Sequence, residues 1–227
     1  MTHDISLNNK VALITGSSRR VGAVVARTLH AAGMKIIIHY NTSKQDALKL
    51  QAELEQNRAD SVFLVKANLL ETEKISSFLD KAIQFTGQLD VLINNASSFY
   101  PTNVGHIVEA DWDNLLGTNL KAPLFLSQAA NLYLQATNGC IINMTDIHAD
   151  RPLKEHVVYS IAKAGLVMLT KSLARELGPN VRVNGISPGA ILWPENGLDD
   201  QTQEAIVAAT ALKRSGTLMI LLKLFYI

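Results

Sequence analysis

The sequence predicts an α/β fold in which helices cover both faces of a single doubly wound, parallel β-sheet. Three observations indicate this fold class. Strand-like and helix-like patterns alternate along the 227 residues, residues 35–40 contain three consecutive isoleucines, and a glycine follows the first strand-like run. An uninterrupted apolar run of this length is typical of a strand buried on both faces. Regular alternation implies βαβ units with right-handed crossovers, and therefore a parallel sheet.

The expected elements follow in chain order. Residues 11–15 form a short β-rich run and are the first strand, and the helical pattern of residues 20–32 comes next. Ser43 is a candidate cap for the following helix, which runs to about residue 57, because a serine hydroxyl accepts well from a first-turn N–H. Further strands are expected at residues 35–40, 61–66, 91–94, 139–144 and 181–186, and further helices at residues 71–85, 110–136 and 159–177.

Length and composition favour one globular domain, residues 1–227. The chain is 48% hydrophobic and 18% charged, which fits a globular enzyme better than a disordered or fibrous chain. Its net charge of +1 gives no field to recruit nucleic acid or anionic membrane. The polar start (residues 1–9) predicts no signal peptide, and no run is predicted to span a bilayer, so a cytoplasmic location is expected. Cys140 is interpreted as a buried small residue rather than a reactive thiol.

A turn suited to a phosphate group follows the first strand, with the sequence Thr15-Gly16-Ser17-Ser18-Arg19-Arg20-Val21-Gly22. Gly16 permits a tight turn, Gly22 permits close packing of helix on sheet, and the new helix directs its first amides at an anion. Two such glycines also occur in plain turns. At the start of a doubly wound sheet, however, they favour dinucleotide binding.

The end of the second strand, His39-Tyr40-Asn41-Thr42-Ser43, indicates which dinucleotide. NAD sites usually present a carboxylate to the ribose here, and this chain has none. Arg19 and Arg20 offer guanidinium groups to a 2′-phosphate or a pyrophosphate. The alternative is a pair of solvated arginines at a helix start, where cations are disfavoured. We therefore predict NADPH rather than NADH.

Asp146, Tyr159 and Lys163 have the order and spacing of a reductase active site. Asp146 closes an apolar strand, and Tyr159 and Lys163 lie four apart, on the same face of a helix. A nearby ammonium is expected to lower the pKa of the Tyr159 phenol, so that the pair can pass a proton to a carbonyl or imine as hydride arrives. Tyr and Lys residues on the surface of ordinary helices often share this spacing, so it indicates a reductase only together with the other motifs.

Small polar residues follow the fourth strand, in the run Asn94-Asn95-Ala96-Ser97-Ser98-Phe99-Tyr100-Pro101. At the carboxyl end of a strand they would line a ligand crevice, and Phe99 could offer a flat apolar face to a planar heterocycle. An ordinary surface or core aromatic is the alternative for Phe99. Asn119 lies inside an apolar helix, where a buried network or an exposed face competes with a catalytic role.

Together these motifs resemble the short-chain dehydrogenase/reductase family over residues 10–217. The resemblance rests on Thr15-Gly16…Gly22, Asn94-Asn95-Ala96, Asn119, Tyr159-x3-Lys163 and Pro188-Gly189. Within that family the chain is similar to pteridine reductases: Arg20 replaces the usual central glycine, Asp146 replaces the usual catalytic serine, and His39-Tyr40 and Ser97–Pro101 match that subgroup. Residues 190–195 resemble bacterial members.

The resemblance implies a Rossmann-like domain that reduces dihydropterins with NADPH, for example 7,8-dihydrobiopterin, dihydromonapterin or dihydrofolate. Tyr159 and Asp146 would deliver a proton to a ring nitrogen while hydride reaches the adjacent carbon. Lys163 would hold the nicotinamide ribose, and Asn119 would support Lys163 through water. A carboxyl group suits a pterin because it matches N–H donors as well as imine nitrogens, whereas a serine hydroxyl is the simpler partner of a ketone.

The resemblance also implies the binding residues. The cofactor would be held by Gly16, Ser17, Arg19, Arg20, Val21, Gly22, His39, Tyr40, Asn41, Ser43, Asn68, Leu69, Asn95, Ala96, Ser97, Thr145, Tyr159, Lys163, Pro188 and Gly189. The pterin would contact Arg20, Ser97, Phe99, Asp146, Tyr159 and Trp193. No metal site is expected. Residues 41–42 lack a basic residue that members often carry, and Asn68 stands where many relatives place an adenine-contacting Asp.

Two other functions stay open: a reductase of a ketone or 3-oxoacyl substrate, and a non-catalytic NADPH-binding protein. The family further implies a homo-oligomer, commonly a tetramer with the long helix of Tyr159 at one interface; a dimer is also compatible with this chain.

Residues 218–227 depart from the family as an apolar tail in place of an amphipathic helix and a last strand. A one-base frameshift explains this tail, because shifted codons would read as the expected residues, and the alternative is a true lineage-specific tail. The gene's DNA across the codon for Thr217 decides between them. If the tail is real, the sheet is expected to lack its last strand.

Overall fold

The computed structural model describes residues 6–189 and 199–216, and within them the predicted fold class is confirmed. Six parallel strands form one sheet in the order β3-β2-β1-β4-β5-β6. The strands are β1 (Val11–Ile14), β2 (Lys35–Tyr40), β3 (Val62–Lys66), β4 (Val91–Asn94), β5 (Cys140–Met144) and β6 (Arg182–Ile186). Because the strand order reverses between β1 and β4, the crevice for a ligand is expected at the carboxyl ends of these two strands.

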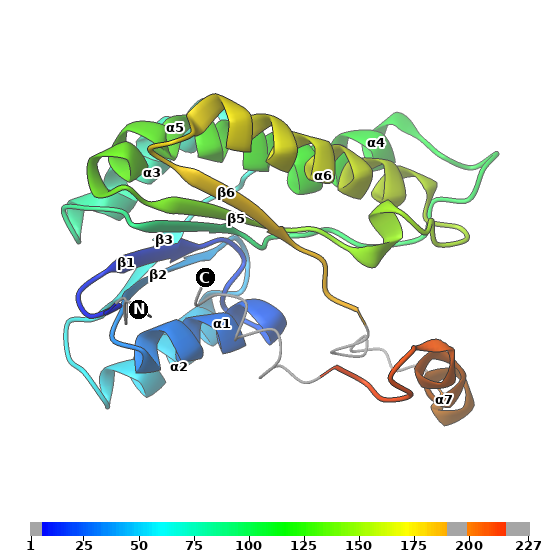
Figure 1. Cartoon of the computed structure of the whole chain (residues 1–227), viewed down its shortest axis with the longest axis horizontal. Coiled ribbons are helices and arrows are strands. Elements are labelled where there is room, and N and C mark those ends of the chain that lie inside the picture. The colour runs from blue at the N-terminus through cyan, green and yellow to red at the C-terminus, as the bar shows by residue number, and fades with distance from the viewer. Residues whose placement is uncertain (1–5, 190–198, 217–227) are drawn as a thin grey trace.

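Helices cover both faces of the sheet (Figure 1). On one face lie α1 (Arg20–Ala31) and α2 (Lys44–Glu55), and on the other lie α3 (Ile75–Gln84), α4 (Glu109–Leu116), α5 (Ala122–Thr137) and α6 (Val157–Leu177). A further helix, α7 (Asp200–Ala209), follows later in the chain. The three-layer arrangement is the one that βαβ crossovers produce.

The hydrophobic core consists of two clusters, one on each face of the sheet. In β1, Ala12 and Ile14 pack toward α1 and α2, whereas Val11 and Leu13 pack toward α3 and α5. Successive side chains of a strand point to opposite faces, so a fully apolar strand supplies both clusters. Each buried Ile or Leu stabilises the fold by about 1.5–3 kcal/mol relative to an exposed one. The strands are therefore fixed in place, and their carboxyl ends hold the site residues at set positions.

The prediction of one continuous helix over residues 110–136 is wrong, because the structure has two helices there. A π-helical turn, η2 (Gly117–Lys121), separates α4 from α5. Pro123 has no N–H to donate to the carbonyl of Asn119, four residues earlier, so a regular α-helix cannot pass through this point. The proline in the sequence could have revealed the break.

Smaller differences concern the helix starts. The prediction for residues 71–85 omitted the 3₁₀ turn η1 (Thr72–Lys74) that precedes α3. Ser43 does stand at the start of α2, but its side chain makes no capping hydrogen bond, so the predicted hydroxyl cap is wrong. The remaining bounds agree to within about two residues, the usual uncertainty of helix and strand ends.

Among the described residues, one helix, α6, is long and apolar enough to cross a membrane by length and composition alone. This helix has 21 residues with a mean hydropathy of 1.3 in its most apolar window. It packs on the sheet through residues such as Leu166, which is 1% exposed, and a core helix needs the same apolar composition. This packing buries part of the apolar side chains of α6.

The interpretation of Cys140 is confirmed, because its thiol is free and buried in β5 and burial raises its pKa. The predictions for the tail (residues 218–227) and for Trp193 lie outside the described residues. In the described part of the chain, β6 is the last strand and an edge of the sheet.

Candidate active site

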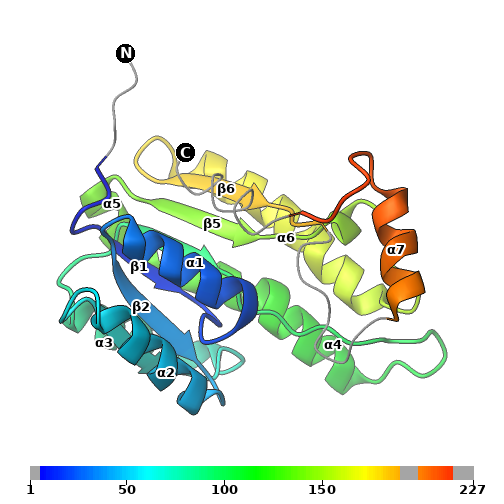
Figure 2. The same cartoon turned by 90° about the horizontal axis from the view of Figure 1, so that it is seen from below.

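The site residues follow the carboxyl ends of β1, β4 and β5, which are neighbours in the sheet. Seen from below in Figure 2, α1 and α2 lie in front of the sheet, and α5 and α6 lie behind it. Thr15 joins β1 and β4, because its Oγ1 accepts hydrogen bonds from the backbone N–H groups of Asn95 and Ala96, both at 2.9 Å. In return, the Asn95 side chain donates to the carbonyls of Thr15 (2.8 Å) and Gly16 (3.1 Å). The turn that follows β1 is thus held directly against the segment that follows β4.

The phosphate turn has the two close approaches that its glycines predict. Gly16 has a φ of +60°, in the left-handed region where L side chains are strained. A Cβ on Gly22 would lie 2.6 Å from the Gly16 carbonyl oxygen and 2.8 Å from Ser17 Cα. Arg20 also adopts a left-handed φ of +51°, so the arginine that replaces the family's glycine keeps a glycine-like backbone. The turn can therefore bring its amides close to a phosphate.

His39 joins this turn to the ends of β2 and β3. Its Nδ1 accepts from the Gly16 N–H at 3.0 Å, and its Nε2 lies 3.1 Å from the Ala67 carbonyl. Because the carbonyl can only accept, we assign the proton to Nε2 and a neutral ring. Burial lowers the pKa of His39 to about 4, and the residue is only 2% exposed. Its structural contacts are with the turn, and a direct contact with the cofactor stays a prediction.

The other predicted cofactor residues lie around the same edge. Arg19 Nε is 3.8 Å from Asp46 Oδ2 on α2, with both side chains well exposed. At the end of β3, the exposed Asn68 accepts from the Leu70 N–H through Oδ1 (3.2 Å), whereas Leu69 is buried. The predictions for these residues, and for Ser17, Val21, Tyr40, Asn41 and Ser43, concern bound cofactor and stay predictions.

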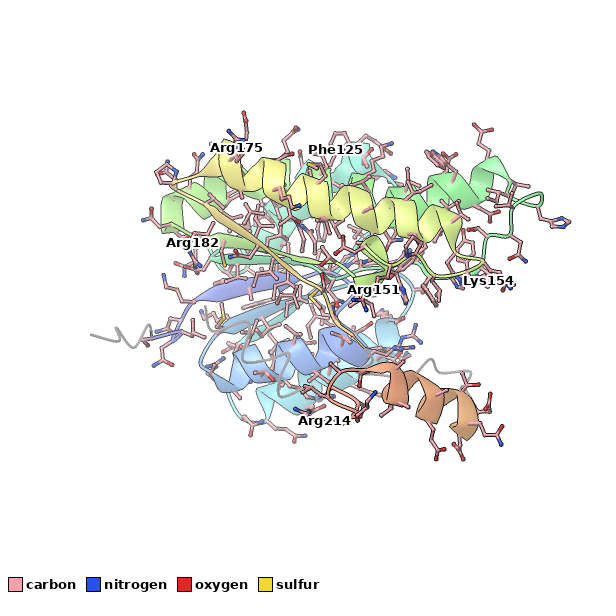
Figure 3. All side chains as sticks on the ribbon, turned by 45° about the vertical axis from the view of Figure 1, so that its right-hand side comes forward. Phe125, Arg151, Lys154, Arg175, Arg182 and Arg214 are labelled. Atoms are coloured by element: carbon pink, nitrogen blue, oxygen red, sulfur yellow. The ribbon has the colours of Figure 1, made fainter. Side chains whose placement is uncertain are left out.

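Asp146 and Tyr159 form the centre of the site. The Tyr159 hydroxyl donates to Asp146 Oδ2 at 2.7 Å, and Asp146 Oδ1 accepts from the backbone N–H of His148 at 2.9 Å. Asp146 begins the 3₁₀ turn η3 (Ile147–Ala149) after β5, and Tyr159 lies in the first turn of α6. Figure 3 shows Arg151 and Lys154 at this end of α6, and Arg175 at its other end. Residues 13 positions apart are thus in direct contact.

The prediction that the Lys163 ammonium lowers the pKa of Tyr159 is wrong for this structure. Burial, together with the neighbouring Asp146 carboxylate, raises the pKa of Tyr159 well above its ordinary value. Lys163 Nζ lies 5.6 Å from the centroid of the Tyr159 ring and donates instead to the Met144 carbonyl at 2.8 Å. Tyr159 is therefore a protonated phenol at neutral pH, a state that suits a proton donor.

Lys163 is a buried titratable group of the site. Its side chain is 4% exposed, and burial lowers its pKa to about 8, opposed by the Asp146 charge. The ammonium predominates below this pH and the neutral amine above it. We expect kcat/KM to fall as pH rises through about 8, because the Lys163 ammonium loses its proton there. Tyr159 stays protonated over this range and does not cause the fall. A pH–rate profile checks this, and an alkaline limb that first begins above pH 10 would contradict the assignment to Lys163.

Asn119 is buried and satisfied by three hydrogen bonds. Its amide donates to the carbonyls of Ser98 and Leu115, both at 2.9 Å, and its Oδ1 accepts from the Ser97 hydroxyl at 2.7 Å. The side chain therefore holds the segment after β4 rather than Lys163. Pro123 cannot donate to the backbone carbonyl of Asn119. The predicted water link between Asn119 and Lys163 stays a prediction.

Phe99 lies beside Tyr159, as its predicted role requires. The two rings meet edge to face with centroids 4.8 Å apart, and Phe99 is 50% exposed. The sequence reasoning missed His156, whose ring stacks on Phe99 at 4.6 Å. Its position three residues before Tyr159, one helical turn away, was the available signal.

The end of β6 is tied to β5 through Thr145. The Thr145 hydroxyl contacts the Ile186 carbonyl (2.9 Å) and the Ser187 hydroxyl (2.6 Å), which places Pro188 and Gly189 next in the chain. Among the residues that the structure describes, no three His, Cys, Asp or Glu side chains come together as metal ligands.

Comparison with known proteins identifies relatives of two kinds. A model of the short chain dehydrogenase family matches residues 10–204. The chain is 35% identical to "Pteridine reductase 1" of Leishmania tarentolae over 225 residues, covering 82% of this chain and 78% of that protein. It is 31% identical to the 3-oxoacyl-[acyl-carrier-protein] reductase of Staphylococcus aureus over 210 residues, covering 91% of this chain and 85% of that protein. The corresponding Staphylococcus epidermidis reductase is also 31% identical, over 211 residues.

Proposed function

This chain belongs to the short chain dehydrogenase family, and we propose that it is an NADPH-dependent reductase of dihydropterins. The observation that carries the proposal is the 2.7 Å hydrogen bond between Tyr159 and Asp146, since a simple ketone reductase needs no carboxylate at this place. The similarity to a pteridine reductase over 82% of the chain supports the same substrate class.

The residues at the carboxyl edge suit a nicotinamide dinucleotide. Gly22 leaves space that a Cβ would fill, and α1 begins directly at the phosphate turn, so backbone amides can bind the pyrophosphate. The absence of a carboxylate from Asn41 to Ser43 and the presence of Arg19 favour the 2′-phosphate form. When bound, the reduced nicotinamide supplies a hydride.

The chain's own residues supply the proton. Tyr159 is buried and protonated, and its hydroxyl proton points at Asp146. A pterin whose ring nitrogen lies within about 3 Å of that hydroxyl would take the proton from Tyr159 as the adjacent carbon receives hydride. Asp146 would accept an N–H bond from the same heterocycle, and Phe99 would cover one of its faces. The net reaction adds one hydride and one proton across a C=N bond.

The direct test is NADPH oxidation by the purified protein with 7,8-dihydrobiopterin, with an acetoacetyl thioester and NADH in parallel assays. Pterin-dependent oxidation of NADPH supports the proposal. Turnover of the thioester without the pterin would instead establish the 3-oxoacyl reductase function, which the similarity to the staphylococcal enzymes favours. Binding of NADPH without either reaction would indicate the non-catalytic alternative.

Asp146→Ser separates the two reductase functions within one protein. We expect kcat/KM for dihydrobiopterin to fall about 10²-fold or more, because the acceptor for pterin N–H groups and the partner of Tyr159 are lost. Thioester turnover should be retained or improve, since serine suits a ketone oxygen. Asp150→Ser, in the same loop but exposed, is the matched control. Equal losses with both substrates in Asp146→Ser would contradict the role in pterin recognition.

We also propose a homo-oligomer that uses the outer face of α6. Ile161 is 45% exposed and Met168 is 60% exposed on this helix, and Leu132 on α5 is 76% exposed. Large apolar side chains at this exposure are typical of a surface that a second copy covers. Sedimentation of wild type and of Met168→Glu tests the proposal, which requires the variant to shift toward smaller species.

A further inference from the structure

The segment that carries Phe99 is fastened to the start of the catalytic helix through Thr102. Thr102 pairs with His156 in an isolated parallel bridge, and its N–H donates to the Glu155 carbonyl. Its hydroxyl accepts from the backbone N–H of Val158 at 3.3 Å, and the residue is 3% exposed. Figure 1 shows the loop before α4 and the segment before α6 at the same end of the molecule. Residues 102 and 158, far apart in sequence, are thereby in contact.

The hydroxyl of Thr102 supplies what α6 lacks at its own start. A helix leaves its first N–H groups without partners in the helix, and a side chain at the preceding residue usually satisfies one of them. His156 occupies that position in α6 and makes no capping hydrogen bond through its side chain. The acceptor for Val158 comes instead from the loop after β4, so loop and helix are stabilised together.

The backbone of Glu155 indicates that this junction is under constraint. Glu155 has a φ of +65°, a left-handed conformation that costs a non-glycine residue energy and persists only where its surroundings enforce it. In this conformation its carbonyl receives the Thr102 N–H. The strained residue thus lies at the contact between the loop and the helix.

An apolar cluster extends the same contact to Tyr159. Val158 and Tyr159 are buried together with Leu115 of α4, and the partly buried Tyr100 and Ile107 of the loop pack against them. Displacement of the loop would therefore uncover the residue that donates the proton.

His156 holds the Phe99 ring itself. The two rings are nearly parallel, with an angle of 18° and centroids 4.6 Å apart, and His156 Nδ1 is fixed by the Lys154 carbonyl at 2.9 Å. Because a carbonyl only accepts, Nδ1 carries the proton and the ring orientation is set. Phe99 stacks on His156 and meets Tyr159 edge to face, and half of its surface remains exposed. The exposed part of its ring is available to a flat ligand.

We propose that Thr102 and His156 are positioning residues that hold Phe99 at a set distance from Tyr159, and that they give the site its selectivity for flat bicyclic heterocycles over flexible acyl chains. The inference rests on the proposed function in one respect, namely that Phe99 is the wall of the substrate site. A stacked ligand needs a wall at a fixed spacing, whereas an extended acyl chain does not.

The experiment compares Thr102→Val, which keeps the shape but removes the hydroxyl, with Thr102→Ser, which restores an acceptor. We expect KM for dihydrobiopterin to rise about fivefold to tenfold in Thr102→Val, the factor typical of losing one cap, and to return toward wild type in Thr102→Ser. The Kd for NADPH should not change. Thr137→Val is the matched control, because Thr137 Oγ1 bonds the Leu89 carbonyl (2.7 Å) away from the site. His156→Ala should raise KM similarly, and His156→Phe should restore it.

Hydrogen exchange at the amide of Val158 provides a readout that needs no substrate. We expect it to exchange about tenfold faster in Thr102→Val than in wild type and in Thr102→Ser. Unchanged exchange in Thr102→Val overturns the proposal, as does a pterin KM equal to that of wild type. If the wild-type enzyme neither binds nor reduces dihydrobiopterin, the proposed function fails and the selectivity for heterocycles fails with it. The exchange experiment then decides only whether Thr102 fastens the loop to α6.

Discussion

Replacing Tyr159 by Phe should lower kcat about 10²- to 10⁴-fold and change the Kd for NADPH far less, because only one of many predicted cofactor contacts is lost. In the proposed mechanism the hydroxyl is the proton donor, and general acid catalysis contributes a factor of this size. The phenylalanine keeps the ring, so the edge-to-face contact with Phe99 and the packing against Leu115 are retained. Steady-state turnover with dihydrobiopterin, together with NADPH binding followed by fluorescence, measures both quantities.

The chain offers a close control for this substitution. The Tyr133 hydroxyl donates to Asp80 Oδ1 at 2.8 Å, on the outer surface of α5 and α3, in a tyrosine–aspartate pair of nearly the same length as that in the site. Tyr133→Phe should leave kcat within about twofold of wild type, because an exposed pair of this kind contributes little. A similar kcat in Tyr159→Phe and Tyr133→Phe would show that the proton comes from another group, with Asp146 the nearest candidate.

Replacing Gly22 by Ala should destabilise the protein and weaken NADPH binding. The added Cβ would lie 2.6 Å from both the Gly16 carbonyl oxygen and Asn95 Nδ2. Backbone atoms at that distance must move, which costs about 1–3 kcal/mol. For a chain of this size each kcal/mol lowers Tm by about 2–4 °C. Because the same movement displaces the phosphate turn, the Kd for NADPH should rise more than about tenfold.

Gly185→Ala separates this effect from the general cost of adding a methyl group. On β6 a Cβ would lie 3.5 Å from its nearest neighbour, the Thr145 methyl, which is an ordinary contact. We expect its Tm and its Kd for NADPH to match those of wild type. Calorimetry and fluorescence titration measure both variants. A Gly22→Ala protein that binds NADPH normally would mean that the turn does not carry the pyrophosphate.

Much of the molecule could be predicted from local patterns. The three isoleucines of β2 predicted a strand buried on both faces, and Ile36, Ile37 and Ile38 are all fully buried. The glycine after β1 predicted a tight turn, and Gly16 has the positive φ that such a turn needs. These predictions succeed because periodicity and backbone freedom depend on neighbouring residues alone.

Other features required the folded chain. Tyr159–Asp146 contact could be expected from a family resemblance, but the raised pKa of Tyr159 follows from its burial and the nearby carboxylate. Thr102 and His156 carry no motif, since each gains its partner from a distant part of the chain.

The sequence by itself therefore determined the order of strands and helices, the class of the fold, and which residues lie where the strands end. The tertiary structure alone decided the protonation of Tyr159 and Lys163, the neutral ring of His39, and the contact of the Phe99 loop with α6. The physical reason is the range of the interactions. Secondary structure depends on residues a few positions apart, whereas desolvation and hydrogen bonding between loops depend on atoms that only folding brings together.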